Sequence, residues 1–294
     1  MNIALTGATG FIGRRFIQLA NEAGHGIIAF TRHPETPVAG CLDTRHYQLE
    51  APLHLDGCEA VLHLAGESVV GLWTKKKRER ILESRVAGTR HVARSILQMQ
   101  TPPRVLLSAS AIGIYGDTGE VETDEFSVAG SGFLAQVALA WERAATPVRE
   151  KGVRLVHPRI AIVYGKGGGA LKPIARVFKL GLGGRLGSGR QWISWIHLDD
   201  LCRLLLFCIA NETISGPINA CSPEPATNAH FTGTLARIVR RPAILPAPAF
   251  ALRVILGGFS AELLGSKRIV PRRALECGFN FQYPGLDPAL RAAV

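Results

Sequence analysis

The sequence predicts an α/β fold in which a doubly wound parallel sheet is joined to a smaller C-terminal lobe. Three observations support this prediction. First, apolar runs of strand length alternate with longer amphipathic segments up to about residue 165. Second, three early glycines separate the first apolar run from the first amphipathic segment. Third, the remainder of the chain is rich in glycine and proline. Alternation of strand and helix along a chain is typical of a parallel sheet with helices on both faces.

Five apolar runs are expected to form strands of this sheet. They cover residues 2–6, 27–31, 60–64, 105–108 and 154–163. Four segments show the helical spacing of apolar residues, namely residues 11–23, 75–98, 132–149 and 201–210. Because neighbouring parallel strands need a long crossover connection, we interpret these helices mainly as links between strands.

The segment from Thr6 to Gly13 carries glycines in a G-x-x-G-x-x-G pattern directly after the first strand. Gly7 permits a tight turn, Gly10 lets backbone N–H groups approach a diphosphate, and Gly13 permits close packing of helix on sheet. The helix N-terminus adds a dipole that favours an anion. The pattern therefore indicates a Rossmann-type dinucleotide site, and glycines that serve only as a tight turn are the alternative. The expected cofactor contacts at this turn are Gly7, Thr9, Gly10, Phe11, Ile12 and Gly13.

The end of the second strand distinguishes NAD from NADP. An NAD site usually has an acidic residue there for the ribose 2′-hydroxyl, whereas an NADP site offers an arginine to the 2′-phosphate. Here the strand ends in Thr31 and Arg32, with no acid in place. A guanidinium can stack on adenine and bind a phosphate through two hydrogen bonds. We therefore expect NADP(H) as the cofactor, held by Thr31 and Arg32 with support from Arg14 or Arg15. A solvated loop position for Arg32 is the alternative.

The C-terminal part differs in composition. Residues 165–190 are rich in glycine and basic side chains, and residues 223–248 carry several prolines around one helix. Near the end, a helix at Pro271 is expected to precede a short aromatic strand. That strand is expected to contain Phe279, Phe281 and Tyr283.

This change in composition suggests two domains. We expect an NAD(P)-binding Rossmann domain at residues 1–165, with its sheet completed by parts of residues 190–222. Residues 166–294 are expected to form a smaller substrate-binding lobe that closes over the site.

Composition and charge exclude several classes of protein. With 47% hydrophobic and 19% charged residues, the chain can build a sizeable core and is not disordered. No apolar run reaches the length of a membrane span, and the N-terminus forms a strand instead of a signal peptide. We therefore expect a soluble cytoplasmic protein without a membrane partner.

The net charge of +11 favours a phosphate-bearing partner. Nucleic acid is the weakest of these candidates, because only 7% of residues are aromatic and none are interleaved with a basic stripe. The densest basic run, Lys75 to Arg78, is interpreted as the solvated face of a helix. The six cysteines lack metal-ligand spacing and are interpreted as buried thiols, so no metal is expected.

Several segments resemble the extended, sugar-nucleotide-epimerase-like branch of the short-chain dehydrogenase/reductase superfamily. Residues 64–66 look like the family's cofactor-lining turn, and residues 108–116 resemble its Ser-Ser…Val-Tyr-Gly segment. Residues 159–165 are similar to the strand that ends at the nicotinamide, and residues 195–201 to a Phe-Ile-His-Val-Asp-Asp segment. The further cofactor contacts that this resemblance implies are Leu64, Ala65 and Gly66.

Three stretches are similar to a narrower subgroup of atypical members, the epimerase-family or YfcH-like proteins. They are residues 83–89, 187–195 and 270–284. Together with the segments above, the resemblance covers nearly the whole chain.

The chain departs from the family pattern at the catalytic pair. The family uses a Tyr-x-x-x-Lys motif, in which the tyrosine is the general acid/base and the lysine lowers its pKa. With Glu142 aligned to the acid that often follows this motif, Leu134 stands at the tyrosine position and Ala138 at the lysine position. Arg85 also replaces a family-typical asparagine. The resemblance therefore implies that the usual proton relay is absent.

The remaining candidates near the nicotinamide are Ser108, Ser110 and Tyr115. Tyr115 is a substitute acid if Arg85 or a nearby lysine lowers its pKa, and the two serines are candidates for orienting a carbonyl. A structural hydroxyl that caps a loop is an equally weighted alternative for Tyr115.

The glycine-rich segment ahead of Trp192 is a candidate substrate clamp. Arg190 is expected to hold an anionic substrate group, and Trp192 to cover it. In the family a His-Asp pair orders the second lobe, so a structural role is favoured for His197 and Asp199.

Two functions follow from the sequence. The first is an NADP-dependent oxidoreductase that acts on a small molecule without the standard pair, since orientation alone lowers a reaction barrier substantially. The second is an NADP(H)-binding sensor or scaffold without redox chemistry. Sugar epimerisation is less favoured, because it needs a proton relay to oxidise and re-reduce one substrate. A monomer and a homodimer both agree with the sequence.

Overall fold

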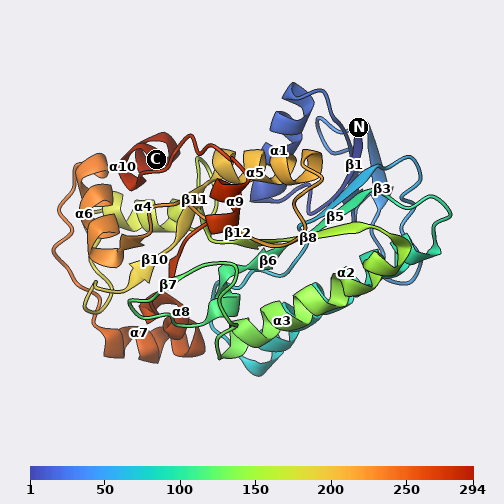
Figure 1. Cartoon of the computed structure of the whole chain (residues 1–294). Coiled ribbons are helices and arrows are strands. Elements are labelled where there is room, and N and C mark those ends of the chain that lie inside the picture. Colours follow the sequence, from blue (N-terminus) through green and yellow to red (C-terminus); the bar gives the residue numbers. More distant parts are fainter.

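A central parallel sheet with helices on both faces forms the larger part of the molecule (Figure 1). The computed structural model describes all 294 residues. The main strands are β1 (Asn2–Thr6), β2 (Gly26–Thr31), β3 (Asp43–His46), β4 (Ala60–His63), β5 (Val105–Ser108), β8 (Arg154–Ile160) and β12 (Gly216–Ala220). They follow the order β12-β8-β5-β4-β1-β2-β3, with every neighbouring pair parallel, and β6 (Ser110–Ala111) pairs with β8 beside this path. The predicted doubly wound α/β fold is confirmed.

Two helices pack together on each face of the sheet. They are α1 (Phe11–Glu22) with α5 (Leu198–Ala210), and α2 (Lys75–Gln98) with α3 (Phe133–Ala145). Figure 1 shows these pairs on opposite sides of the strands. In β1, Ile3 and Leu5 belong to the core that includes α1 and α5, whereas Ala4 belongs to the core that includes α2. The strand is a continuous apolar run because neither of its faces meets water.

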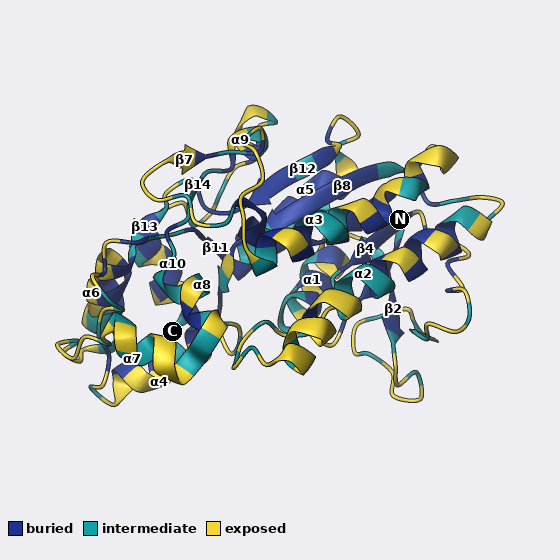
Figure 2. Cartoon of the chain, turned by 90° about the horizontal axis from the view of Figure 1, so that it is seen from below, coloured by how far each residue is buried: buried dark blue, intermediate teal, exposed yellow.

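A smaller lobe gathers at one end of the molecule (Figure 2). Its helices are α4 (Leu171–Lys179), α6 (Asn228–Val239), α7 (Ala249–Leu256), α8 (Ser260–Leu264) and α10 (Leu286–Ala293). The lobe has its own core, in which the rings of Tyr164 and Trp195 stack with centroids 5.9 Å apart. None of the helices in the chain combines the length and apolar composition needed to cross a membrane.

Short elements lie between the larger helices and strands of both parts. They are 3-10 turns η1 (Ile112–Tyr115), η2 (Thr146–Lys151) and η3 (Gly257–Phe259), helix α9 (Arg272–Glu276), and strands β7 (Glu122–Thr123), β9 (Ile162–Tyr164), β10 (Trp192–Ile193), β11 (Trp195–His197), β13 (Ala226–Thr227) and β14 (Arg268–Ile269). The strands form three two-stranded ladders: β9 with β11, β10 with β13, and β7 with β14.

Two expected elements are interrupted. The strand expected over residues 154–163 divides at Ala161, whose N–H donates to the carbonyl of Ala220, and β9 then leaves the main sheet to pair with β11. The helix expected over residues 132–149 ends as α3, and the tighter turn η2 follows with Pro147 in its first turn. Proline lacks the N–H that an α-helix would need there.

The aromatic strand expected at Phe279, Phe281 and Tyr283 is wrong. This segment has no strand partner, and the N–H groups of Gln282 and Tyr283 each donate to the carboxylate of Asp200 at 2.8 Å. Phe279 packs against Phe207 of α5 with ring centroids 5.5 Å apart. Phe279 and Phe281 therefore pack with the core around α5, and Tyr283 packs with the core of the smaller lobe.

Candidate functional site

The turn between β1 and α1 has the geometry that three glycines allow. Gly7 has a φ of +77°, which an L-residue rarely adopts. The N–H of Gly10 donates to the carbonyl of Gly7 at 3.0 Å. A Cβ at Gly13 would lie 2.3 Å from that same carbonyl oxygen, so helix and turn touch backbone to backbone.

The N-terminus of α1 is open to an anion. Gly10 is its N-cap and offers no side-chain hydrogen bond. The first N–H to bond within the helix is that of Arg14, which donates to the carbonyl of Gly10. The N–H groups of Phe11 and Ile12 therefore remain as first-turn donors, which together with the helix dipole suit a phosphate.

The turn that follows β4 lies directly against this site. The N–H of Ala65 donates to Thr6 Oγ1 at 3.3 Å, and a Cβ at Gly7 would lie 3.1 Å from the carbonyl carbon of Leu64. The structure thus brings residues 64–66, singled out by resemblance, to the phosphate turn.

Arg32 stands at the carboxyl end of β2, the strand next to β1. Its side chain is exposed and takes part in none of the ion pairs of the chain. The hydroxyl of Thr31 accepts from the N–H of His33 at 3.2 Å. Arg32 is therefore free to meet a ligand, while Thr31 shapes the backbone beside it.

Arg15 is already engaged elsewhere. Its Nε donates to Asp199 Oδ1 at 2.6 Å, and this contact joins α1 to α5. The ring of His197 accepts from the N–H of Asp199 and lies 4.0 Å, centroid to centroid, from the ring of Tyr283. Of the two arginines considered as helpers, only Arg14 is exposed and unpaired.

A buried polar network occupies the region after β5. Tyr115 donates its hydroxyl to Asn219 Oδ1 at 2.7 Å and accepts from Arg159 Nη1 at 2.8 Å. Ser110 Oγ donates to Glu142 Oε1 at 2.7 Å. Ser108 is fully buried, and its hydroxyl has no partner.

The condition set for Tyr115 as a substitute acid, a pKa lowered by a neighbouring cation, is not met. Burial raises the pKa of Tyr115 to about 12, although Arg159 pulls in the opposite direction. The cation over the Tyr115 ring is Arg159, at 5.2 Å, and not Arg85. Only 3% of Tyr115 is exposed, and its hydroxyl connects η1 with Arg159 of β8 and Asn219 of β12.

Leu134 and Ala138 face the turn η1 from α3. The Leu134 side chain lies 3.1 Å from the place of a Cβ at Gly113. Ala138 is buried in one apolar cluster with Ile112 and Ile114. Both side chains make purely apolar contacts between α3 and η1.

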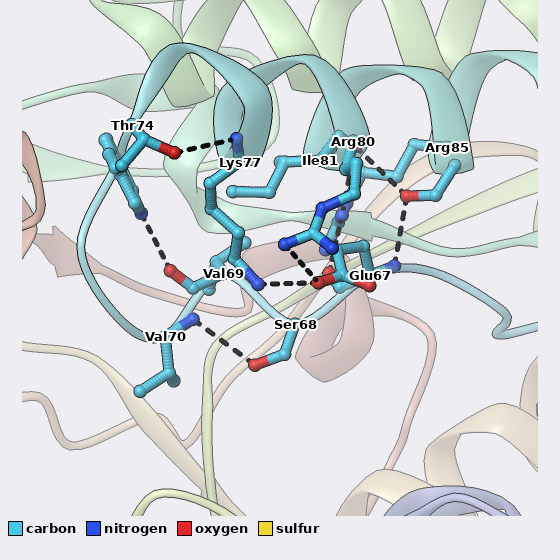
Figure 3. A network of polar contacts seen from close by, with 11 residues as sticks. Glu67, Ser68, Val69, Val70, Thr74, Lys77, Arg80, Ile81 and Arg85 are labelled. Atoms are coloured by element: carbon cyan, nitrogen blue, oxygen red, sulfur yellow. Dashed lines mark hydrogen bonds and ion pairs between the residues drawn. The ribbon is translucent and has the colours of Figure 1, made fainter.

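A second polar network, which the sequence did not predict, surrounds the loop after Gly66 (Figure 3). Lys77 Nζ lies 2.6 Å from Glu67 Oε1, so one member of the basic run is paired and not simply solvated. Arg85 Nη1 donates to the carbonyls of Glu67 and Ile81 at 2.9 and 3.2 Å. Two features of the sequence could have indicated this network: an acidic residue directly after the cofactor-lining turn, and basic residues at helical spacing on α2.

Arg85 lies beside the cofactor-lining turn without a carboxylate partner. Its guanidinium carbon would be 3.6 Å from a Cβ at Gly66, and it stands 5.0 Å from the ring centroid of Trp141. Burial lowers the pKa of Arg85 to about 10, which still leaves it charged at neutral pH. A half-buried cation with only carbonyl and ring partners is well suited to receive an anionic or strongly polar ligand.

The two candidate clamp residues differ in their surroundings. Trp192 Nε1 donates to Glu120 Oε2 at 2.6 Å, and Arg268 lies 4.9 Å over its ring. Arg190 is exposed and has no ion pair. Trp192 is thus fixed by other segments, whereas Arg190 points to solvent from the same loop.

Comparison with known proteins gives one consistent family. A model of the NAD dependent epimerase/dehydratase family matches residues 3–221, and a model of a domain of unknown function (DUF1731) matches residues 247–293. Epimerase family protein YfhF of Bacillus subtilis (strain 168) is 35% identical over 298 residues, covering 99% of this chain and 97% of that protein. The chloroplastic SDR39U1 homolog of Arabidopsis thaliana, also titled an epimerase family protein, is 36% identical over 302 residues, covering 99% and 86%. The crystal structure of human epimerase family protein SDR39U1 (isoform2) with NADPH superposes with a TM-score of 0.92 at 31% identity, covering 100% of this chain and 99% of that one.

Proposed function

The chain belongs to the NAD dependent epimerase/dehydratase family, and on that premise we propose that it is an NADP(H)-dependent oxidoreductase for a small molecule. The observation that carries the proposal is the phosphate turn, in which Gly7 has a positive φ, Gly13 leaves no room for a Cβ and α1 begins without a side-chain cap. The human relative solved with NADPH supports the same cofactor.

The residues around the turn fit a dinucleotide. The diphosphate would rest on the N–H groups of Phe11 and Ile12, with Leu64 and Ala65 against its other side. Arg32 would hold the 2′-phosphate, because it is the exposed cation at the end of β2 and no acid precedes it on that strand. When bound, NADPH supplies a hydride equivalent to the substrate.

The reacting end lacks the family's proton relay in this proposal. Leu134 and Ala138 carry no titratable group, and Tyr115 holds its proton too tightly near neutral pH. We assign Arg85 the task of stabilising negative charge that develops on a substrate oxygen, because its cation lies beside Gly66 and forms no ion pair with a carboxylate. Ser110 orients Glu142 and not the substrate, since its hydroxyl hydrogen is already donated.

The experiment that tests this function has two parts. Fluorescence titration of the purified chain should give tighter binding of NADPH than of NADH. NADPH deuterated at C4 should then transfer its label to at least one carbonyl compound of a panel of aldehydes, ketones and sugar nucleotides. Arg85→Met should lower the rate of label transfer while leaving NADPH affinity within about twofold. If the glycine turn alone formed the functional site, the substitution would leave the transfer rate unchanged as well.

An NADP(H) sensor without redox chemistry is the second candidate. It is favoured by the full engagement of Tyr115 and Ser110 within the buried network, which leaves only the buried Ser108 hydroxyl without a partner among the three candidates. Under this alternative, NADPH binds tightly and no label leaves it with any carbonyl compound.

A further inference from the structure

Helix α7 is unusual because it has no buried residue. Its large apolar side chains face solvent, with Phe250 70%, Val254 81% and Ile255 69% exposed. Phe250, Arg253 and Val254 share one side of the helix by their spacing of three and four residues. These three side chains therefore form an apolar surface that no other segment of the chain covers.

Two neighbouring segments continue the apolar surface. The chain from α6 to α7 runs along the end of the smaller lobe (Figure 1). Its residues Ile244 and Leu245 are 77% and 53% exposed. It lies against the loop after α4, because the N–H of Ala247 donates to the carbonyl of Arg185, and Leu182 in that loop is 58% exposed. We call the exposed side chains of α7, residues 180–185 and residues 240–248 the end face.

The segments that form the end face carry cations and no carboxylate. Residues 165–198 contain six lysines and arginines, and residues 225–261 contain four, with no aspartate or glutamate in either segment. Nine of these ten cations are exposed and take part in no ion pair, and Arg237 is the exception. Four of the nine belong to the end face itself: Arg185, Arg240, Arg241 and Arg253. Arg240 keeps a left-handed φ of 55° at the end of α6, a position that glycine usually occupies.

We propose that the end face is a peripheral docking surface for anionic lipid membranes. Large aliphatic side chains within a basic surface suit the boundary between lipid headgroups and acyl chains, where cations meet anionic headgroups and apolar groups leave water. This replaces the expectation of no membrane partner, which rested on the absence of a spanning segment. The proposal is independent of the proposed hydride chemistry.

Other occupants fit the charge and the side chains less well. A second copy of the chain would bring the same cations together without a carboxylate to neutralise them. A single-stranded nucleic acid would meet one aromatic ring, Phe250, where stacking platforms use several. An acidic protein would satisfy the charge, and it is distinguished by the experiment below.

The test measures sedimentation of the whole chain with vesicles. Binding is expected to vesicles of phosphatidylcholine with an equal share of phosphatidylglycerol, to be weaker by at least about tenfold with phosphatidylcholine alone, and to weaken as salt increases. The double variant Val254→Ser/Ile255→Ser and the double variant Arg240→Glu/Arg241→Glu should each lower binding to the anionic vesicles by about tenfold or more.

Matched controls lie elsewhere on the surface. Val128→Ser removes an apolar side chain that is 88% exposed outside the end face, and Arg90→Glu/Arg94→Glu reverses two exposed cations of α2. Neither should change vesicle binding by more than about twofold.

Three outcomes would overturn the proposal. They are no binding to anionic vesicles at low salt, equal loss in the control variants, and binding that depends on charge but not on Val254 and Ile255. Conversion of a dimer to a monomer by the Val254→Ser/Ile255→Ser variant would assign the face to self-association instead.

Discussion

Arg159 of β8 meets Glu142 of α3 in a two-point ion pair. Arg159 Nε lies 2.9 Å from Glu142 Oε1, and Arg159 Nη2 lies 3.0 Å from Glu142 Oε2. The pair is largely shielded, with 10% of the Arg159 side chain and 15% of the Glu142 side chain exposed. Arg159 also donates to Tyr115, and Ser110 donates to Glu142, so one pair connects β6, η1, α3 and β8. It therefore fixes α3 against the sheet beside the candidate site.

Removal of the carboxylate should destabilise the fold strongly. Glu142→Gln leaves the Arg159 guanidinium in a shielded position without its countercharge, which costs roughly 3–5 kcal/mol for a buried pair. Urea unfolding followed by circular dichroism measures this loss. Glu79→Gln, on an exposed part of α2, is the control and should change the unfolding free energy by less than about 0.5 kcal/mol. A loss of that small size in Glu142→Gln would show that the pair carries no stability.

The same pair predicts how stability depends on acid. Burial opposes the ionisation of Glu142, but Arg159 outweighs burial and lowers the pKa of Glu142 below its ordinary value of 4.5. A carboxyl whose pKa is lower in the folded state stabilises the fold above its unfolded pKa, and this contribution disappears as the pH falls through the folded value. The difference in unfolding free energy between wild type and Glu142→Gln should therefore be constant at neutral pH and shrink below about pH 4.5. A difference that grows on acidification would contradict this assignment.

Tyr115→Phe separates a structural hydroxyl from a catalytic one. The change leaves the buried Asn219 and Arg159 each short of one partner, so we expect a loss of roughly 1–3 kcal/mol in unfolding free energy. Because burial raises the pKa of Tyr115 to about 12, the pH profile of any turnover between about pH 6 and 9 should keep its shape in the variant. If the variant lost an ionisation step between about pH 6 and 9, this would show that Tyr115 takes part in the reaction.

The fold could be predicted from the sequence where burial fixes the pattern. Strands such as β1 are apolar on both faces, so their runs stand out from their surroundings. β3 was not predicted, because this edge strand reads Asp-Thr-Arg-His and its residues are partly or fully exposed. The expected strand at Phe279–Tyr283 failed for the opposite reason, since its aromatic residues pack into the two cores without any ladder.

The candidate site was predictable where it is local in sequence. Gly7 to Gly13 lie within one turn, so spacing alone indicates their geometry. The network of Tyr115 depends on Arg159 and Asn219, which are 44 and 104 residues away. A local sequence pattern does not indicate hydrogen-bond partners at such separations. Burial of the hydroxyl determines its pKa, and this burial is a property of the folded chain only.

Gly13→Ala should damage the phosphate turn through backbone contact. The added methyl group would lie 2.3 Å from the carbonyl oxygen of Gly7, and the turn must open by shifting α1. Overpacking of this kind costs roughly 1–3 kcal/mol, and NADPH affinity should fall by about tenfold or more. Gly233→Ala on α6 is the matched control, because a Cβ there meets nothing within 4 Å. It should leave affinity unchanged and stabilise the helix by up to about 1 kcal/mol. If the two variants bound NADPH with equal affinity, the turn would not be part of the cofactor site.

Arg32→Ala tests the choice between the two pyridine nucleotides. A guanidinium that binds a phosphate contributes about 1.5–3 kcal/mol, so the dissociation constant for NADPH should rise by roughly ten- to a hundredfold. NADH lacks the 2′-phosphate, and its affinity should therefore change by less than about twofold. Isothermal titration of both nucleotides into both proteins measures the four affinities. Arg143→Ala, an exposed arginine of α3, controls for the loss of one positive charge and should leave all of them unchanged. If Arg32→Ala weakened NADPH and NADH by the same factor, Arg32 would contact a part of the nucleotide common to both, and the selection of NADP(H) would have to come from Arg14 or another cation near α1.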